Sequence, residues 1–213
     1  MRPPFAVLLI VALEGCAVWE QTGFLSHNAQ LRQQAQNQAP LVYTSPGVDW
    51  TKYSSAILMP VQVWDSPDTT INQHDQTMLS SYYYCALRGR LSSNLRIVDP
   101  PSPGVLTIRV ALTNPTAVSP VMRAISIDLP QECILSSVKN LAKRSYAFVR
   151  SAHSESEILN SVTGEQLATA VDPNVSRSST TNAEESGGAE HAMDLWAERL
   201  DQRLTDWRLG PET

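Results

Sequence analysis

The stretch VLTIRVALT, Val105–Thr113, decides the fold class because apolar side chains recur at every second position along it. Side chains at this spacing share one face of a β-strand. Those expected to face the core are Leu106, Ile108, Val110 and Leu112. Thr107, Arg109 and Thr113 fall on the opposite face, which is expected to point outward. The stretch therefore predicts a half-buried strand near the middle of the chain.

Further strands are expected before and after this one. In Ser55–Trp64 the alternating apolar residues are Ile57, Met59, Val61 and Val63. Pro60 has no N–H to donate, so this strand is expected at a sheet edge or with a bulge at the proline. Leu95–Val98 predicts a short strand. A long strand over 146–160 and a second over 167–171 are expected to form a hairpin, with Gly164 in the turn.

Two amphipathic helices are predicted, over 71–92 and 189–207. The apolar stripe of the first is Leu79, Tyr83, Leu87 and Leu91. That of the second is Ala192, Met193, Trp196, Leu200, Leu204 and Trp207. Residues 133–143 are a candidate for a shorter helix. The order β-α-β-β-(α)-β-β-α predicts an α+β fold, with one mixed or antiparallel sheet and the helices packed on one of its faces.

Length and composition predict one domain. The chain has 213 residues, of which 42% are hydrophobic, and its net charge is -5. We expect the domain to cover 46–213, with a low-complexity mobile loop over 176–188. We expect 16–45 to be a lipidated tether and docking segment. Trp19–Pro40 is polar apart from TGFLSHNAQL, which is expected to dock onto the domain. The basic residues are scattered, so nucleic acid is not an expected partner.

The first residues resemble a bacterial lipoprotein signal. Arg2 precedes an apolar run that is too short to span a bilayer. Leu13-Glu14-Gly15-Cys16 resembles a lipobox, in which the cysteine thiol receives a diacylglycerol and the peptide is cut before it. We expect 1–15 to be the signal peptide and Cys16 the lipidation site. Glu14 departs from the usual small neutral residue, and cleavage elsewhere or a retained N-terminal strand are the alternatives.

Two further cysteines, Cys85 and Cys133, are left after Cys16. They can pair in an oxidising compartment, or both can be buried thiols. Their spacing and flanking residues do not suggest a disulfide framework, so two buried thiols are the favoured alternative.

One group of residues has the composition of a reactive or metal-binding site. In SAHSESEI, a strand would place His153, Glu155 and Glu157 on one face, and such a set can bind a divalent metal or act as acid and base. The alternative, which we favour, is the solvated face of a half-buried strand. The residues turned inward would then be Ala152, Ser154, Ser156 and Ile158. Since no nucleophile, phosphate-loop or zinc motif occurs, we expect no enzyme, cofactor or resident metal.

Six aromatic side chains are candidates for a partner surface. They are Trp19, Trp50, Trp64, Tyr82, Tyr83 and Tyr84. Core packing is the alternative for Trp64 and for one or two of the tyrosines, and Tyr83 also belongs to the apolar stripe of the first helix.

Several stretches together resemble a proteobacterial family of outer-membrane lipoproteins that is catalogued as a domain of unknown function. They are TGFLSHNAQL (22–31), VDWTKYSSAILMPVQVW (48–64), PPSPGVLTIRVALTNP (100–115), NSVTGEQLATAVD (160–172) and AMDLWAERLDQRL (192–204). Cys85 and the serine-rich composition of 176–186 depart from the family pattern. The resemblance implies a lipid on Cys16 and no catalytic residues.

The function expected from these features is that of a lipid-anchored module at the periplasmic face of the outer membrane. Its partners would be the membrane, through Cys16, and a protein of the cell envelope. The rival hypothesis is a periplasmic enzyme or a ligand- or metal-binding protein that uses the face carrying His153, Glu155 and Glu157.

Overall fold

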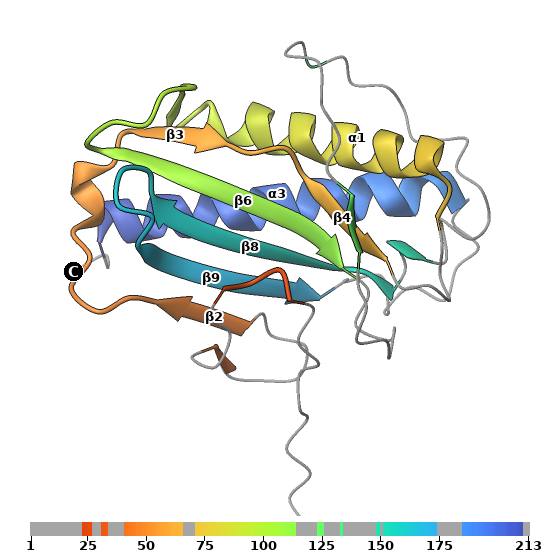
Figure 1. The fold of residues 1–213 in the computed structure, drawn as a ribbon, viewed down its shortest axis with the longest axis horizontal. Coiled ribbons are helices and arrows are strands. Elements are labelled where there is room, and N and C mark those ends of the chain that lie inside the picture. The colour runs from red at the N-terminus through yellow and green to blue at the C-terminus, as the bar shows by residue number, and fades with distance from the viewer. Residues whose placement is uncertain are drawn as a thin grey trace, which may run out of the picture.

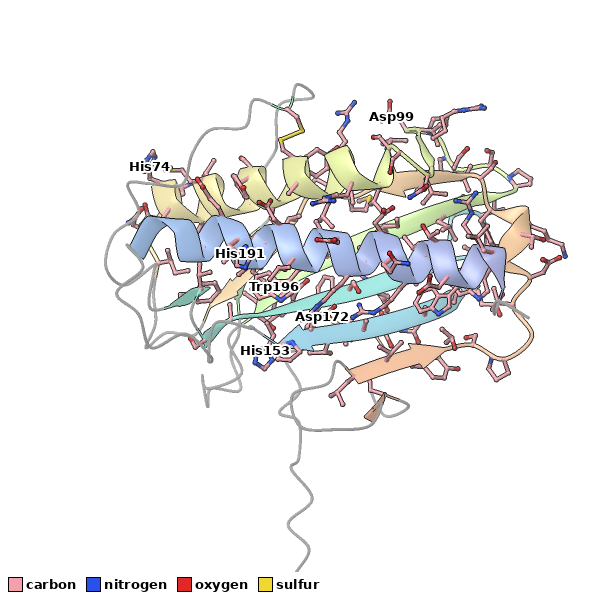
Figure 2. All side chains as sticks on the ribbon, turned by 180° about the vertical axis from the view of Figure 1, so that it is seen from behind. His74, Asp99, His153, Asp172, His191 and Trp196 are labelled. Carbon is pink, nitrogen blue, oxygen red and sulfur yellow. A yellow bond between two sulfur atoms is a disulfide. The ribbon has the colours of Figure 1, made fainter. Side chains whose placement is uncertain are left out.

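The protein is described from a computed structural model, which describes residues 23–26, 31–33, 41–65, 71–113, 123–125, 133, 148–149, 151–173 and 185–210. It has two layers (Figure 1): a sheet, and two helices, α1 (Gln73–Leu91) and α3 (Glu185–Leu209), that pack side by side over one face of the sheet. Figure 2 shows the same layers from the helix side. The predicted α+β fold with helices on one face is confirmed.

The sheet of the described residues is mixed and has nine strands. They are β1 (Arg32–Gln33), β2 (Leu41–Thr44), β3 (Ser55–Leu58), β4 (Gln62–Asp65), β5 (Arg96–Ile97), β6 (Val105–Thr113), β7 (Arg123–Ile125), β8 (His153–Asn160) and β9 (Gln166–Pro173). Their order is β1-β2-β9-β8-β6-β3-β5, and β4 joins β6 to β7. The pairs β3–β5, β3–β6 and β4–β6 are parallel, and the remaining pairs are antiparallel. A single 3-10 helix, η1 (Trp50–Lys52), precedes β3 in this part of the chain.

Strand β6 lies in the middle of the sheet and begins and ends where the alternation predicts. Its four predicted core residues are all buried in the main hydrophobic core. Ala111 and Thr113 on the opposite face are also fully buried. We call that face the outer face, because it is the face of the sheet turned away from α1 and α3. It is therefore covered near the end of β6. The burial of both faces was not predicted. Alternation indicates which side chains share a face of the strand, but it does not indicate what packs on each face.

The predicted strand over Ser55–Trp64 is two strands with a break at Pro60. Leu58 lies opposite Ile108 and Gln62 lies opposite Ala111, so the first strand has one more residue than β6 between these pairs. This extra residue is a bulge of the kind expected for Pro60, and it exchanges the two faces. The buried residues are consequently Ala56, Leu58, Val61 and Val63. The prediction that Ile57 and Met59 share a face with Val61 and Val63 is wrong, and Met59 is 41% exposed.

Both helices carry the predicted apolar stripes. Asn72 caps α1, since its side chain accepts a hydrogen bond of 2.9 Å from the backbone N–H of Asp75. The four stripe residues of α1 are buried, as are those of α3 except Trp207, which is half-buried. Helix α3 begins at Glu185, so the last residues of the predicted loop 176–188 are helical instead. The beginning of that loop lies outside the described residues.

The hairpin of β8 and β9 forms as predicted, with Gly164 in its turn at a φ of +70°. The start of the predicted long strand is wrong. Phe148 and Val149 are helical and buried, and β8 begins only at His153. The candidate helix over 133–143 lies outside the described residues, apart from Cys133. Strands β1, β2 and β7 are too short to leave an alternation in the sequence.

A disulfide joins Cys85 of α1 to Cys133, with the two Cα atoms 5.4 Å apart. The less favoured of the two alternatives for these cysteines is therefore the one that the structure shows. The bridge ties the segment between β7 and β8 to the helix layer, so it closes a loop between residues 48 apart in sequence. No helix of the described residues has the length and apolar character needed to cross a membrane.

Removing this disulfide is expected to destabilise the fold. The variant Cys85→Ala with Cys133→Ala should lower the free energy of unfolding by about 2–4 kcal/mol, because it frees a long loop in the unfolded chain. Urea unfolding measures the loss, and Cys16→Ser is the matched control that should leave stability unchanged. An equal effect of both changes, or a Cys16-containing bridge in a non-reduced peptide map, would contradict the pairing.

Candidate functional site

The residues predicted to form a site do share one face of β8. Glu155 and Glu157 lie on the outer face, while Ser154 of the other face contacts Tyr83 of α1 with 2.6 Å between their hydroxyl oxygens. The favoured prediction of a solvated face is wrong. Glu155 is 1% exposed and Glu157 is fully buried, whereas His153 at the strand end is half-buried. The structure thus places two buried carboxylates on the outer face of the sheet.

Glu157 is held by three partners. Arg109 lies directly opposite it on β6, and the guanidinium Nη1 donates to Glu157 Oε2 in a close ion pair. The side-chain amide of Gln166 donates to Glu157 Oε1 at 3.0 Å. The backbone N–H of Ser26 donates to the same oxygen at 3.2 Å. A buried carboxylate needs this degree of pairing, because burial of an unpaired charge costs several kcal/mol.

Glu155 is satisfied by a different group. The hydroxyl of Thr113 donates to Glu155 Oε1 at 2.8 Å, and both residues are buried. Within the described residues no group of three or more His, Cys, Asp or Glu side chains is placed to hold a metal ion. The three residues singled out in the sequence are therefore brought onto one strand but not around one point, and the carboxylate of Glu157 is committed to Arg109.

The cover of this face is the N-terminal segment Gly23–Ser26, which we call the docked segment. Phe24 is 3% exposed and Leu25 is 6% exposed, although both precede every strand of the sheet. They form an outer apolar cluster with Ala111 and Val171, flanked by the half-buried residues Leu31, Leu41 and Trp64. The segment thus packs on side chains from β4, β6 and β9.

Two ring contacts orient Phe24. Its edge meets Trp64 with ring centroids 6.2 Å apart and planes at 75°. The guanidinium carbon of Arg109 lies 5.0 Å from the Phe24 centroid, which is a cation–π contact. Arg109 consequently binds the carboxylate of Glu157 and the ring of Phe24 together. Gly23, at a φ of +85°, supplies the left-handed turn by which the chain enters the site.

Simple magnitudes show that the docking is finely balanced. Burial of a Phe or Leu side chain contributes roughly 1.5–3 kcal/mol each. Ordering the backbone costs about 1–2 kcal/mol for every residue of the segment. These two quantities nearly cancel, so the hydrogen bond to Glu157 and the contact with Arg109 decide whether the segment stays docked.

A further buried carboxylate, that of Asp172 of β9, lies on the helix side of the sheet (Figure 2). Arg203 of α3 donates to both of its oxygens, and Arg199 lies 3.7 Å from Oδ1. Nearby, the indole N–H of Trp196 donates to the carbonyl of Pro173 at 3.2 Å. These groups fasten α3 to β9. The sequence pattern of the helix does not predict the Arg203–Asp172 ion pair. It places Arg203 near the C-terminus of the helix, where the helix dipole favours a positive charge, but it gives no information about Asp172.

Tyr83 completes the buried polar groups under the helices. Burial raises the pKa of Tyr83 well above its ordinary value, and its hydrogen bond with Ser154 only partly opposes this rise. The side chain therefore stays a neutral hydroxyl. Its role is to form a hydrogen bond with Ser154, a polar residue of β8 that is buried beneath α1.

The aromatic residues divide between core and boundary. Trp50 and Tyr83 are buried, so for them a partner surface is wrong. Trp50 stacks near Trp207 with centroids 4.9 Å apart. Trp64, Tyr82 and Tyr84 are half-buried, and the hydroxyl of Tyr82 donates to Asp194 of α3 at 3.1 Å. Trp19 lies outside the described residues.

Comparison with known proteins gives a family and one distant structure. The model of the family described as "Protein of unknown function (DUF3313)" matches residues 20–200. No curated protein matches the sequence. A solved structure, a dodecamer of a single-substitution variant of PelC from Paraburkholderia phytofirmans, is 13% identical over 76% of this chain and 97% of that chain, with a TM-score of 0.34. A similarity at this TM-score supports no conclusion about fold or function.

The ion pair beneath the docked segment should be worth far more than an exposed one. Arg109→Ala is expected to lower the free energy of unfolding by about 2–3 kcal/mol, because it leaves the buried carboxylate of Glu157 without its cation. The loss is smaller than for a fully buried pair, since Arg109 is partly exposed. Arg90→Ala, which removes the exposed pair with Glu198, should cost less than about 0.5 kcal/mol. Urea unfolding of both variants measures the difference.

A second change tests the cause of this loss. Glu157→Gln added to Arg109→Ala should restore part of the stability, since a neutral amide no longer needs a cation. If Arg109→Ala costs no more than Arg90→Ala, or if the added Gln gives no recovery, Glu157 is not a buried charge.

Proposed function

The chain belongs to the DUF3313 family of proteins of unknown function, and we propose that it is a lipid-anchored interaction module at the periplasmic face of the outer membrane. In this proposal the signal peptide over 1–15 is removed and Cys16 carries the lipid. The domain then acts through contacts with a protein partner in the cell envelope.

The observation that carries the proposal is the docked segment. Cys16 precedes Gly23 by seven residues, and an extended chain of that length spans at most about 25 Å. A lipid on Cys16 would therefore hold the domain close to the membrane, with the outer face of the sheet nearest the anchor. Two or more acyl chains are needed for lasting attachment, which is what a lipobox cysteine receives.

The disulfide supports the proposed compartment. Bridges such as Cys85–Cys133 persist in oxidising surroundings, of which the bacterial periplasm is one, and are rare in the cytosol. It also leaves Cys16 as the one cysteine of the sequence outside this bridge.

The pairing of the buried charges supports an interaction role over catalysis. Glu157 is bound to Arg109, and Asp172 is bound to Arg203. Charges neutralised in this way stabilise the fold and position the docked segment, whereas a general acid or base has to reach a substrate. In the rival hypothesis the face carrying His153, Glu155 and Glu157 is an active or metal-binding site. The described contacts of Glu155 and Glu157 are accounted for by a stabilising role instead.

Mass spectrometry of the protein from bacterial membranes tests the proposal. We expect a chain that starts at residue 16 and carries acyl mass, and we expect that mass to be absent from Cys16→Ser. The matched control is Cys85→Ala with Cys133→Ala, which removes the two other cysteines but should keep the acyl mass. A wild-type chain that is cut elsewhere and carries no acyl mass would refute the lipid anchor.

A further inference from the structure

We propose that the outer face of the sheet around Glu157 is a binding site for an extended peptide segment with a Phe-Leu pair, and that residues 23–26 are its occupant in this structure. The site rests on the proposed function, because it is the surface through which such a module would contact a partner protein.

The apolar part of the site is built without the docked segment. Its floor is formed by Trp64 of β4, Ala111 of β6 and Val171 of β9, which belong to the folded sheet. Phe24 and Leu25 pack against these side chains and are almost completely buried, with exposures of 3% and 6%. An aromatic and an aliphatic side chain in adjacent positions are therefore what the floor accommodates.

The polar part of the site contacts one main-chain group and one ring. Glu157 accepts a hydrogen bond of 3.2 Å from the backbone N–H of Ser26, a group that any residue except proline can supply. Arg109 faces the Phe24 ring at 5.0 Å, which favours an aromatic over an aliphatic residue at that place. Anchor side chains together with a main-chain contact are the usual elements of extended-peptide recognition.

The occupant is exchangeable because its docking is finely balanced. As part of the same chain, the docked segment competes with a partner at an effective concentration in the millimolar range for a short link. Partner binding to the intact protein is thus weak until the segment leaves.

Exchange would also change the reach of the domain. With the segment docked, Cys16 is seven residues from the domain; without it, the next strand of the described residues is β1, which begins at Arg32, 16 residues from Cys16. The maximum span grows from about 25 Å to about 55 Å. Binding of a partner at this site would therefore let the domain move away from its anchor.

A peptide-binding assay tests the site directly. The probe is a fluorescein-labelled peptide with the sequence EQTGFLSHNAQL (20–31), and the protein is the full chain with Cys16→Ser. Emptying the site with Phe24→Ala and Leu25→Ala should tighten peptide binding by about tenfold or more in fluorescence anisotropy, because the competing segment is lost.

Three controls define specificity. A peptide with both apolar anchors replaced by alanine should not bind the emptied chain. Glu157→Ala in the emptied chain should weaken binding about tenfold, through loss of a hydrogen bond to a charged group. Val162→Ala, at an exposed position of the hairpin turn, should leave binding unchanged.

The proposal is overturned if the emptied chain unfolds cooperatively on heating but binds the peptide no more tightly than its parent. If the emptied chain does not fold, the ¹⁵N-labelled chain with an intact segment decides instead. Unlabelled peptide at millimolar concentration should shift the amide signals of Gly23 and Ser26, and unchanged signals would refute the site. Both assays use unlipidated protein, so their result is independent of the acyl mass on Cys16.

Discussion

The burial of the Glu157 carboxylate is the constraint on which the outer half of the structure depends. A charge with no solvent exposure in the middle of a sheet has to be neutralised and hydrogen-bonded. The register of β6 and β8 places Arg109 directly opposite, and Gln166 and the backbone of Ser26 supply the remaining donors. One pair of residues therefore links the strand register to the docking of the N-terminal segment. Without the segment, the ion pair would be open to water on one side.

The two faces of the sheet solve the same problem in different ways. On the helix side, Asp172 is held by arginines of α3, so the charge fastens a long helix with an extensive apolar stripe. On the outer side, Glu157 is covered by a short segment that brings only Phe24 and Leu25. Among the residues that the structure describes, the helix side is thus secured by many contacts and the outer side by few. This asymmetry is why we propose the outer face as the place where the chain exchanges a contact of its own for one with a partner.

Most of the framework could be predicted from the sequence, because β6, α1 and α3 each have a long and regular apolar pattern. The face of β3 could not, since the bulge at Pro60 shifts the alternation by one residue. The pairing of Glu157 could not either. Its partner Arg109 is 48 residues away, and only the alignment of β6 with β8 brings the two together. Alternation placed Glu155 and Glu157 on one face but carried no information about what covers that face.

Hydrogen exchange at the backbone amide of Ser26 reports whether the N-terminal segment is docked, since this N–H donates to Glu157 in the docked state. We expect this amide to be protected in the native protein and to exchange by local opening, faster than amides in the middle of β6. Exchange at the rate of an unstructured peptide would show that the segment is not docked and that the Glu157 carboxylate is not covered by it.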